Sequence, residues 1–159
     1  MTPDPMPPTS IAIDAVVGEL AAVRAFVRER VAAVGGDELT MTDLVQAIDE
    51  LVTNVIEHGY AGRPGRVDVG AARIGDDIVF VIRDDAPPFD PRSVPDPPLD
   101  LPLERRPLGG MGVHLARTLT DRLDHRILPT GGNEVTVHKR LRTAVGGSGD
   151  GHHDRPTEP

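Results

Sequence analysis

Three short stretches of the sequence contain residue types whose spacing could support chemistry, and the first lies at positions 50–60. Glu50 precedes Asn54 by four positions, and His58 follows after another four. On a helix this spacing places the side chains on one face, one turn apart. A carboxylate one turn from a carboxamide suits Mg²⁺, which takes few protein oxygens and keeps water or phosphate ligands. The same row also fits the ordinary polar edge of an amphipathic helix.

The second and third stretches are an acidic pair and a glycine run. Asp84 and Asp85 follow an apolar, β-rich segment, where a carboxylate can accept a hydrogen bond from an exocyclic amine. A solvated turn is the alternative for this pair. Gly109, Gly110 and Gly112 precede a helical pattern, so close backbone approach and a helix N-terminus could form a phosphate cradle. The run is neither a Walker A motif nor a Rossmann fingerprint, because it lacks Gly-Lys-Ser/Thr and follows a loop.

Hydrophobic periodicity predicts the elements that position these residues, beginning with a strand and a helix. Residues 10–14 alternate between apolar and polar types, as expected for a short strand. From Val16 to Val34, valines and a leucine recur at steps of three and four. This stripe predicts an amphipathic helix that Gly35-Gly36 ends.

A second helix is expected to carry the row at 50–58. Thr40 is its predicted cap, Asp43 a weak capping-box partner, and Gly59 its end. The row borders the core because it is displaced from the apolar stripe, which consists of Leu44, Ile48, Leu51 and Val55.

The remaining pattern indicates an α+β fold, a two-layer sandwich in which helices cover one face of a mixed, mostly antiparallel sheet. A proline-rich loop is expected at 86–107, an unusual length that is often functional. The other predicted elements are strands at 66–72 and 78–83 with a turn at 75–77, a helix at 113–119, and strands at 123–128 and 134–141 with a turn at 131–133.

Composition excludes several function classes. The 159 residues include 17 Lys+Arg and 25 Asp+Glu, and the net charge of −8 argues against binding nucleic acid or a membrane through bulk charge. The absence of cysteine excludes disulfides and thiolate metal sites. With no membrane span or signal segment in the sequence, we expect a soluble, cytoplasmic protein. Its expected parts are a flexible arm at 1–9, one domain at 10–142 and a disordered tail at 143–159.

The order and spacing of the three stretches also carry a family resemblance. Glu-x-x-x-Asn on a helix, Asp after a strand, a long loop and Gly-x-Gly opening a helix resemble the Bergerat-fold nucleotide site of the GHKL ATPase superfamily. Within it, the runs 50–60 and 84–91 resemble those of the anti-sigma-factor serine/threonine kinases, the partner-switching kinases of bacteria. The resemblance covers residues 10–141 and implies the Bergerat ATP-binding fold.

The resemblance implies a role for each matching residue. Glu50 would activate the attacking hydroxyl group, Asn54 would bind Mg²⁺ and ATP, and Asp84 would accept a hydrogen bond from the adenine amino group. Residues of about 90–108 would form the ATP lid. The further ATP-binding positions would be Ala86, Gly109, Gly110, Met111, Gly112 and Val113.

The resemblance also implies partners. The substrate would be a STAS-type anti-anti-sigma protein, an alternative sigma factor would be held inactive, and the kinase would form a homodimer. Arg24 matches the partner-contacting arginine of such kinases, although a solvated arginine at a helix edge fits the sequence equally well.

One departure from the family pattern motivates a second hypothesis. Ala86 stands where the family usually has glycine. If the backbone there needs a positive φ, alanine costs about 1 kcal/mol and lowers ATP affinity. The alternative function is therefore a non-catalytic ATP-binding module that regulates through protein binding alone.

Overall fold

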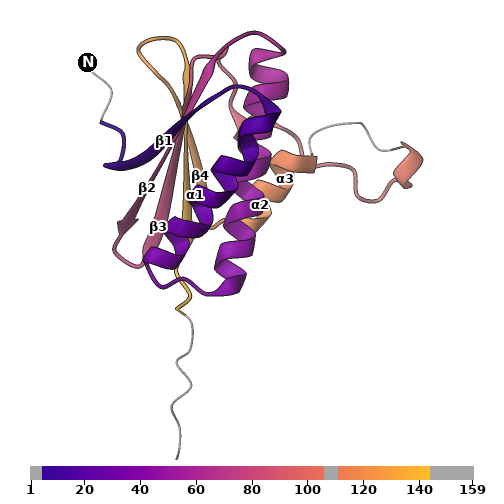
Figure 1. Ribbon diagram of the computed structural model, residues 1–159. Coiled ribbons are helices and arrows are strands. Elements are labelled where there is room, and N and C mark those ends of the chain that lie inside the picture. The colour runs from indigo at the N-terminus through magenta and orange to yellow at the C-terminus, as the bar shows by residue number, and fades with distance from the viewer. Residues whose placement is uncertain (1–4, 106–110, 144–159) are drawn as a thin grey trace, which may run out of the picture.

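An open five-stranded sheet carries three α-helices on one face (Figure 1) in the computed structural model, which describes residues 5–105 and 111–143. The strands are β1 (Thr9–Asp14), β2 (Arg66–Ile74), β3 (Asp77–Asp84), β4 (Arg122–Ile127) and β5 (Asn133–Arg140). The helices are α1 (Leu20–Ala33), α2 (Glu38–Asn54) and α3 (Met111–Leu119).

The sheet order is β1-β2-β3-β5-β4, and the described strands all pair in antiparallel fashion. The predicted α+β sandwich is therefore confirmed, whereas the expected mixture of strand directions is absent from this part of the chain. The two hairpins, β2–β3 and β4–β5, join through the pairing of β3 with β5. That pairing places Asp84 directly opposite Asn133.

The core fills the space between the helices and the inner face of the sheet. Alternate residues of β3 point inward, and Phe80 makes an edge-to-face contact with Phe26 of α1 at 6.4 Å between ring centroids. The predicted stripe of α2 is buried at Leu44, Ile48 and Leu51, while Val55 is partly buried. The polar row that includes Glu50 therefore borders the core, as the periodicity predicted.

The first helix begins later than its apolar stripe predicted. Val16 has an extended backbone (φ −132°, ψ 143°), the segment Val17–Glu19 is a 3-10 turn, and α1 starts at Leu20. Val16 and Val17 are 52% and 55% exposed, so they add nothing to the buried face. The three- and four-residue spacing therefore extends past the true start of the helix.

The second helix has a different cap from the predicted one. Asp37, with an extended backbone, accepts a hydrogen bond from the Thr40 N–H at 2.8 Å, so Asp37 caps α2 and Thr40 lies inside the first turn. Asp43 therefore has no capping role; its carboxylate accepts a hydrogen bond from Lys139 of β5 at 3.0 Å.

The end of the second helix also differs from the prediction. Residues Val55–Tyr60 continue α2 as a π-helical turn, so Gly59 lies within the helix and does not end it. The turn ends at Ala61, whose left-handed backbone (φ 50°) reverses the chain. π-helical turns are rare and occur frequently at functional sites.

The long loop is present at the predicted place and is anchored near its start. It contains the 3-10 turns Pro91–Ser93 and Leu103–Arg105. Arg117 of α3 donates hydrogen bonds to the carbonyl of Val94 at 2.7 Å and to the carboxylate of Asp96 at 2.8 Å. Beyond this anchor, the segment that ends at Arg105 extends away from the body of the fold (Figure 1).

The described chain is held near both of its ends, by β2 at one end and by the connection between α1 and α2 at the other. Met6 and Pro7 pack against Gly70 of β2, where a Cβ would lie within 3.0 Å of both side chains. Thr143 pairs with Gly36 through an isolated bridge. Residues 1–4, 106–110 and 144–159 lie outside the described structure, so the boundaries of the arm and tail remain predictions. In the ranges 5–105 and 111–143, no helix has the length and apolar character needed to cross a membrane.

Candidate functional site

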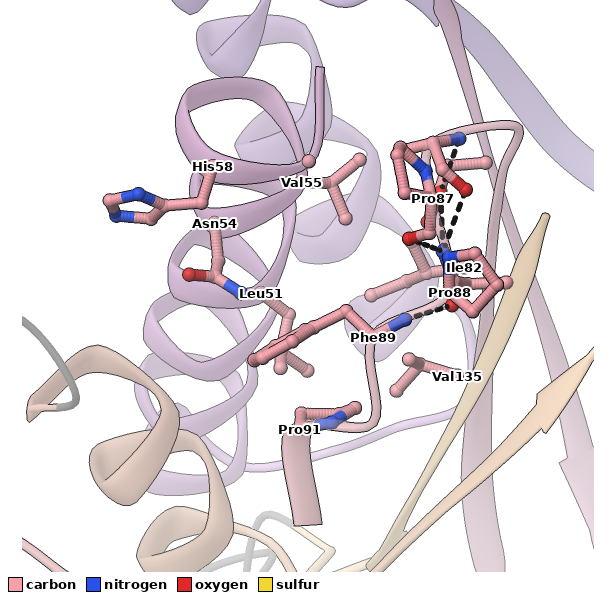
Figure 2. A pocket seen from close by; sticks show the side chains of 14 residues that line it. Leu51, Asn54, Val55, His58, Ile82, Pro87, Pro88, Phe89, Pro91 and Val135 are labelled. Carbon is pink, nitrogen blue, oxygen red and sulfur yellow. Dashed lines mark hydrogen bonds between the residues drawn. The ribbon is translucent and has the colours of Figure 1, made fainter. Parts of the chain in front are cut away.

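A pocket of about 240 Å³ lies between α2, the sheet and the start of the loop after β3 (Figure 2). Its walls are apolar. In Figure 2 the Leu51 and Val55 side chains project from α2 and its π-helical turn toward the sheet, and the Phe89 ring reaches from the loop toward Leu51. Ile82 and Val135 supply the sheet side. A slot with these walls suits a flat aromatic ligand.

The polar base of this pocket is Asp84, at the end of β3. Asp84 is only 4% exposed, and its Oδ1 accepts hydrogen bonds from the Ala86 N–H at 2.9 Å and from Asn133 Nδ2 at 3.0 Å. Burial raises the pKa of Asp84 above its usual range, while these two donors act in the opposite direction. Oδ2 accepts no hydrogen bond from the residues that the structure describes. Asp84 therefore has a spare acceptor for a ligand donor.

Asn133, the first residue of β5, organises the base of the pocket, and the sequence analysis missed it. Its Nδ2 also lies 3.2 Å from the Ala86 carbonyl and 3.1 Å from the Pro87 carbonyl. Its Oδ1 accepts the Phe89 N–H at 2.8 Å and lies 2.9 Å from His125 Nε2. The sequence assigned Asn133 to a turn, and only the strand register that pairs it with Asp84 gives it this place.

Glu50 and Asn54 lie along α2, as the spacing predicted. The Glu50 carboxylate contacts the first turn of α3, where a Cβ on Gly112 would overlap Oε2. Burial, followed by the charges of Asp49 and Glu57, raises the pKa of Glu50. In Figure 2, Asn54 lies on the near face of the helix and His58 projects from the side away from Val55, and both residues line the pocket.

The oxygens of Glu50 and Asn54 fit a divalent cation such as Mg²⁺. Within residues 5–105 and 111–143, neither side chain has a hydrogen-bond partner. Their polar atoms therefore remain available to a ligand. Hard oxygen donors in small number, completed by water and phosphate, match the preference of Mg²⁺.

The glycine run is described only in part. Met111, Gly112 and Val113 form the first turn of α3, beside Glu50. Gly109 and Gly110 lie outside the described residues, so their contact with phosphate remains a prediction.

Ala86 lines the pocket without the backbone strain that the sequence analysis considered. Ala61 is the non-glycine residue with positive φ in the described chain, so Ala86 adopts an ordinary backbone conformation. The penalty that alanine pays at positive φ therefore does not arise at this position.

Arg24 lies on α1, away from the pocket. Its guanidinium donates to the Asp49 carboxylate of α2 at 2.7 Å, and its side chain remains 37% exposed. The residue is thus neither a free surface arginine nor a core residue, and its contact with a partner remains a prediction.

Comparison with known proteins places this geometry in a family. A family model described as the histidine kinase-like ATPase domain matches residues 13–139. The chain belongs to the histidine kinase-like ATPase domain family. The Bergerat-type resemblance inferred from the motifs is thereby confirmed, and the pocket lies in the ATPase domain itself.

Two curated relatives of this ATPase domain are serine-protein kinases. The proteins named serine-protein kinase RsbW from Bacillus cereus and from Bacillus thuringiensis subsp. konkukian are each 28% identical over 104 residues. The alignments cover 63% of this chain and 64% of each relative, which is less than two thirds of the relatives' length.

A solved structure extends the likeness to three dimensions. The RsbU and RsbW domains of Rv1364c from Mycobacterium tuberculosis match with a TM-score of 0.60 and 29% sequence identity. The match covers 86% of this chain and 32% of that chain. It agrees with the predicted GHKL-type fold and with the likeness to partner-switching kinases.

Proposed function

We propose that this chain is an ATP- and Mg²⁺-dependent protein serine/threonine kinase that regulates a sigma factor. The observation that carries the proposal is the pocket over Asp84 that Asn54 also lines, together with Glu50, which lies one helical turn before Asn54 and against the start of α3. Two RsbW serine kinases among the relatives support it. The phosphorylated partner would be a STAS-type anti-anti-sigma protein, and an alternative sigma factor would be the protein that is sequestered.

The apolar slot and its polar base suit adenine. The flat ring would lie between the α2 side chains and the sheet, and its exocyclic amine would donate to Asp84 Oδ2. A purine without that amine would leave a buried acceptor unpaired, which is an effective basis for selectivity.

Phosphate binding would fall to the neighbouring helix ends. Asn54 would hold Mg²⁺, and that ion would neutralise charge on the phosphates during transfer. The first turn of α3 would add backbone N–H donors. With the metal ion and the backbone N–H groups facing the phosphates, a protein of negative net charge could bind ATP.

Glu50 would act as the base in the transfer. Its carboxylate accepts the proton of the substrate Ser or Thr hydroxyl while the oxygen attacks the γ-phosphorus. The bond from the γ-phosphorus to the bridging oxygen breaks, and that oxygen leaves with ADP. The raised pKa of Glu50 makes it a stronger base than a solvated carboxylate.

Phosphoryl transfer to a cognate STAS protein tests the kinase directly. Wild-type protein incubated with γ-labelled ATP and Mg²⁺ is expected to label the STAS protein, and Glu50→Gln is expected to lose about 10²-fold or more in rate. Nucleotide binding by Glu50→Gln, measured by calorimetry, should persist. Equal label transfer by both proteins would contradict the proposal.

The non-catalytic alternative makes the opposite prediction. It expects Glu50→Gln to retain every regulatory effect, whereas Asp84→Asn should abolish nucleotide-dependent complexes. Ala86 was the residue that motivated this alternative, and its ordinary backbone no longer favours it. A homodimer remains part of the proposal, through the kinase resemblance alone.

A further inference from the structure

We propose that Asn133 and His125 are positioning residues that set the base selectivity of the pocket. They hold Asp84 so that a single carboxylate oxygen remains for an exocyclic amine, and they fix the wall of the pocket at 86–89. This inference rests on the proposed ATP site and adds the residues that determine how selectively the base is read.

The first step concerns the two oxygens of Asp84. Oδ1 receives both the Asn133 amide and the Ala86 N–H, at 3.0 and 2.9 Å. Two donors satisfy this oxygen and prevent the carboxylate from rotating to exchange its oxygens. The remaining acceptor, Oδ2, is therefore held in one direction rather than distributed over two.

The second step is that the same amide fixes the wall of the slot. Nδ2 faces the carbonyls of Ala86 and Pro87, while Oδ1 receives the Phe89 N–H. Without Asn133 these backbone groups would lack buried partners, and the segment would rearrange to find others. Asn133 consequently couples the position of the Asp84 carboxylate to that of the pocket wall at residues 86–89.

The third step assigns the orientation of the amide to His125. If the Asn133 amide turned so that Oδ1 and Nδ2 exchanged places, its NH₂ group would face the Phe89 N–H and its oxygen would face the carboxylate of Asp84. His125, on the edge strand β4, has its Nε2 atom 2.9 Å from Oδ1; with the proton on Nε2, the imidazole donates to Oδ1 and penalises this exchange further. The His125 side chain is only 6% exposed and lies 3.8 Å from Asp90 at the start of the lid segment.

Glycine at position 132 makes this arrangement possible. A Cβ there would overlap the carbonyl oxygen of Asp84. Only a residue without a side chain lets β5 start so close to the end of β3, and this close approach brings the Asn133 amide to Asp84.

The test compares two nucleotides on the full chain. Calorimetry would measure binding of ATP and of its 6-deamino analogue, in which hydrogen replaces the amino group. The wild-type protein is expected to prefer ATP by about tenfold or more, because a charge-assisted hydrogen bond is lost with the amine. Asn133→Leu, of similar size, is expected to reduce this preference to about twofold, mainly by weakening ATP binding.

A second pair of variants keeps the test decisive if Asn133→Leu does not fold. His125→Leu should lower the preference for ATP, whereas His125→Gln, whose amide can replace the Nε2–H donor, should restore it. The matched control is Lys139→Met, which removes another buried polar residue of β5 that binds Asp43 and the Leu119 carbonyl. This control should weaken stability without changing the ratio of the two affinities.

The outcomes separate this inference from the proposed function. If the wild type prefers ATP but the Asn133 and His125 variants keep the full preference, the positioning role is wrong and the ATP site stands. A wild type that binds ATP no better than the analogue overturns the base-reading role. If the wild type binds neither nucleotide, the proposed function itself fails.

Discussion

Among the individual residues, Glu50 shows most clearly that a group suited to catalysis can lower the stability of the fold. Its ordinary pKa of 4.5 is raised in the folded chain by burial and by the charges of Asp49 and Glu57. The folded state therefore binds more protons than the unfolded state just above that pH. Stability must then fall as the pH rises through the window between the unfolded and the folded pKa.

The variant Glu50→Gln removes this unfavourable charge. We expect it to melt at a higher temperature than the wild type at about pH 7, since an ionised, partly buried carboxylate is replaced by a neutral amide. The advantage should shrink as the pH falls below the unfolded pKa, where the wild-type residue is itself neutral. Thermal unfolding followed by circular dichroism across this range measures the difference, and a pH-independent gap would contradict the assignment.

At the scale of secondary-structure elements, the contact between α2 and α3 sets the place of the catalytic group. The Glu50 carboxylate occupies the space that a side chain at Gly112 would need. Gly112 therefore serves two needs: it opens α3 and leaves room for the acid on the neighbouring helix.

Gly112→Ala should consequently displace the Glu50 carboxylate. A displacement of about 1 Å at a reacting group can cost about 10²-fold in rate, and we expect a loss of that order in phosphoryl transfer. The control is Gly18→Ala, where an added Cβ meets nothing within 4 Å. If Gly112→Ala transfers phosphate at the wild-type rate while folding normally, Glu50 does not work from this position.

The elements also show which parts of the site a sequence can predict. The helix-borne row of Glu50 and Asn54 follows from a period of about 3.6 residues, and the strand before Asp84 from its apolar run. These features depend on local spacing, and the structure has them as predicted. Asn133 depends instead on the register between β3 and β5, which pairs residues 49 positions apart.

The predicted ends of the second helix were wrong for a related reason. Thr40 and Asp37 are both good capping residues, and the choice between them depends on which backbone is extended. Likewise, Gly59 predicts a helix end, but tertiary packing against Ala86 holds it within a π-helical turn, where a Cβ would approach the Ala86 Cβ to 3.0 Å. Local sequence preference determines neither the capping residue nor the end of the helix.

At the scale of the whole molecule, the nucleotide site and the predicted partner-binding residue lie on different helices. Asn54 and Asp84 line the pocket, while Arg24 projects from α1 and is held by Asp49 of α2. Although Asp49 directly precedes Glu50 on α2, neither Arg24 nor Asp49 lines the pocket. Binding to protein partners and binding to nucleotide should therefore be separable by mutation.

Arg24→Ala is expected to weaken binding of the cognate STAS protein or sigma factor by about tenfold or more, as arginines at interfaces often do. Nucleotide affinity should stay within about twofold of the wild type, because Arg24 lies outside the pocket. The loss of unfolding free energy should stay below about 1 kcal/mol, since the ion pair with Asp49 is partly exposed and screened by solvent. Calorimetric titrations with each partner and with ATP measure these effects.

Arg73→Ala is the appropriate control, because Arg73 is an exposed arginine near the end of β2, on the opposite layer from α1. It removes the same charge from a protein that is already acidic, so any effect of net charge on partner association appears in both variants. Equal weakening by the two substitutions would reduce the role of Arg24 to bulk electrostatics. A selective loss in Arg24→Ala, with unchanged ATP affinity, would place the partner surface on α1 and leave the pocket to the nucleotide.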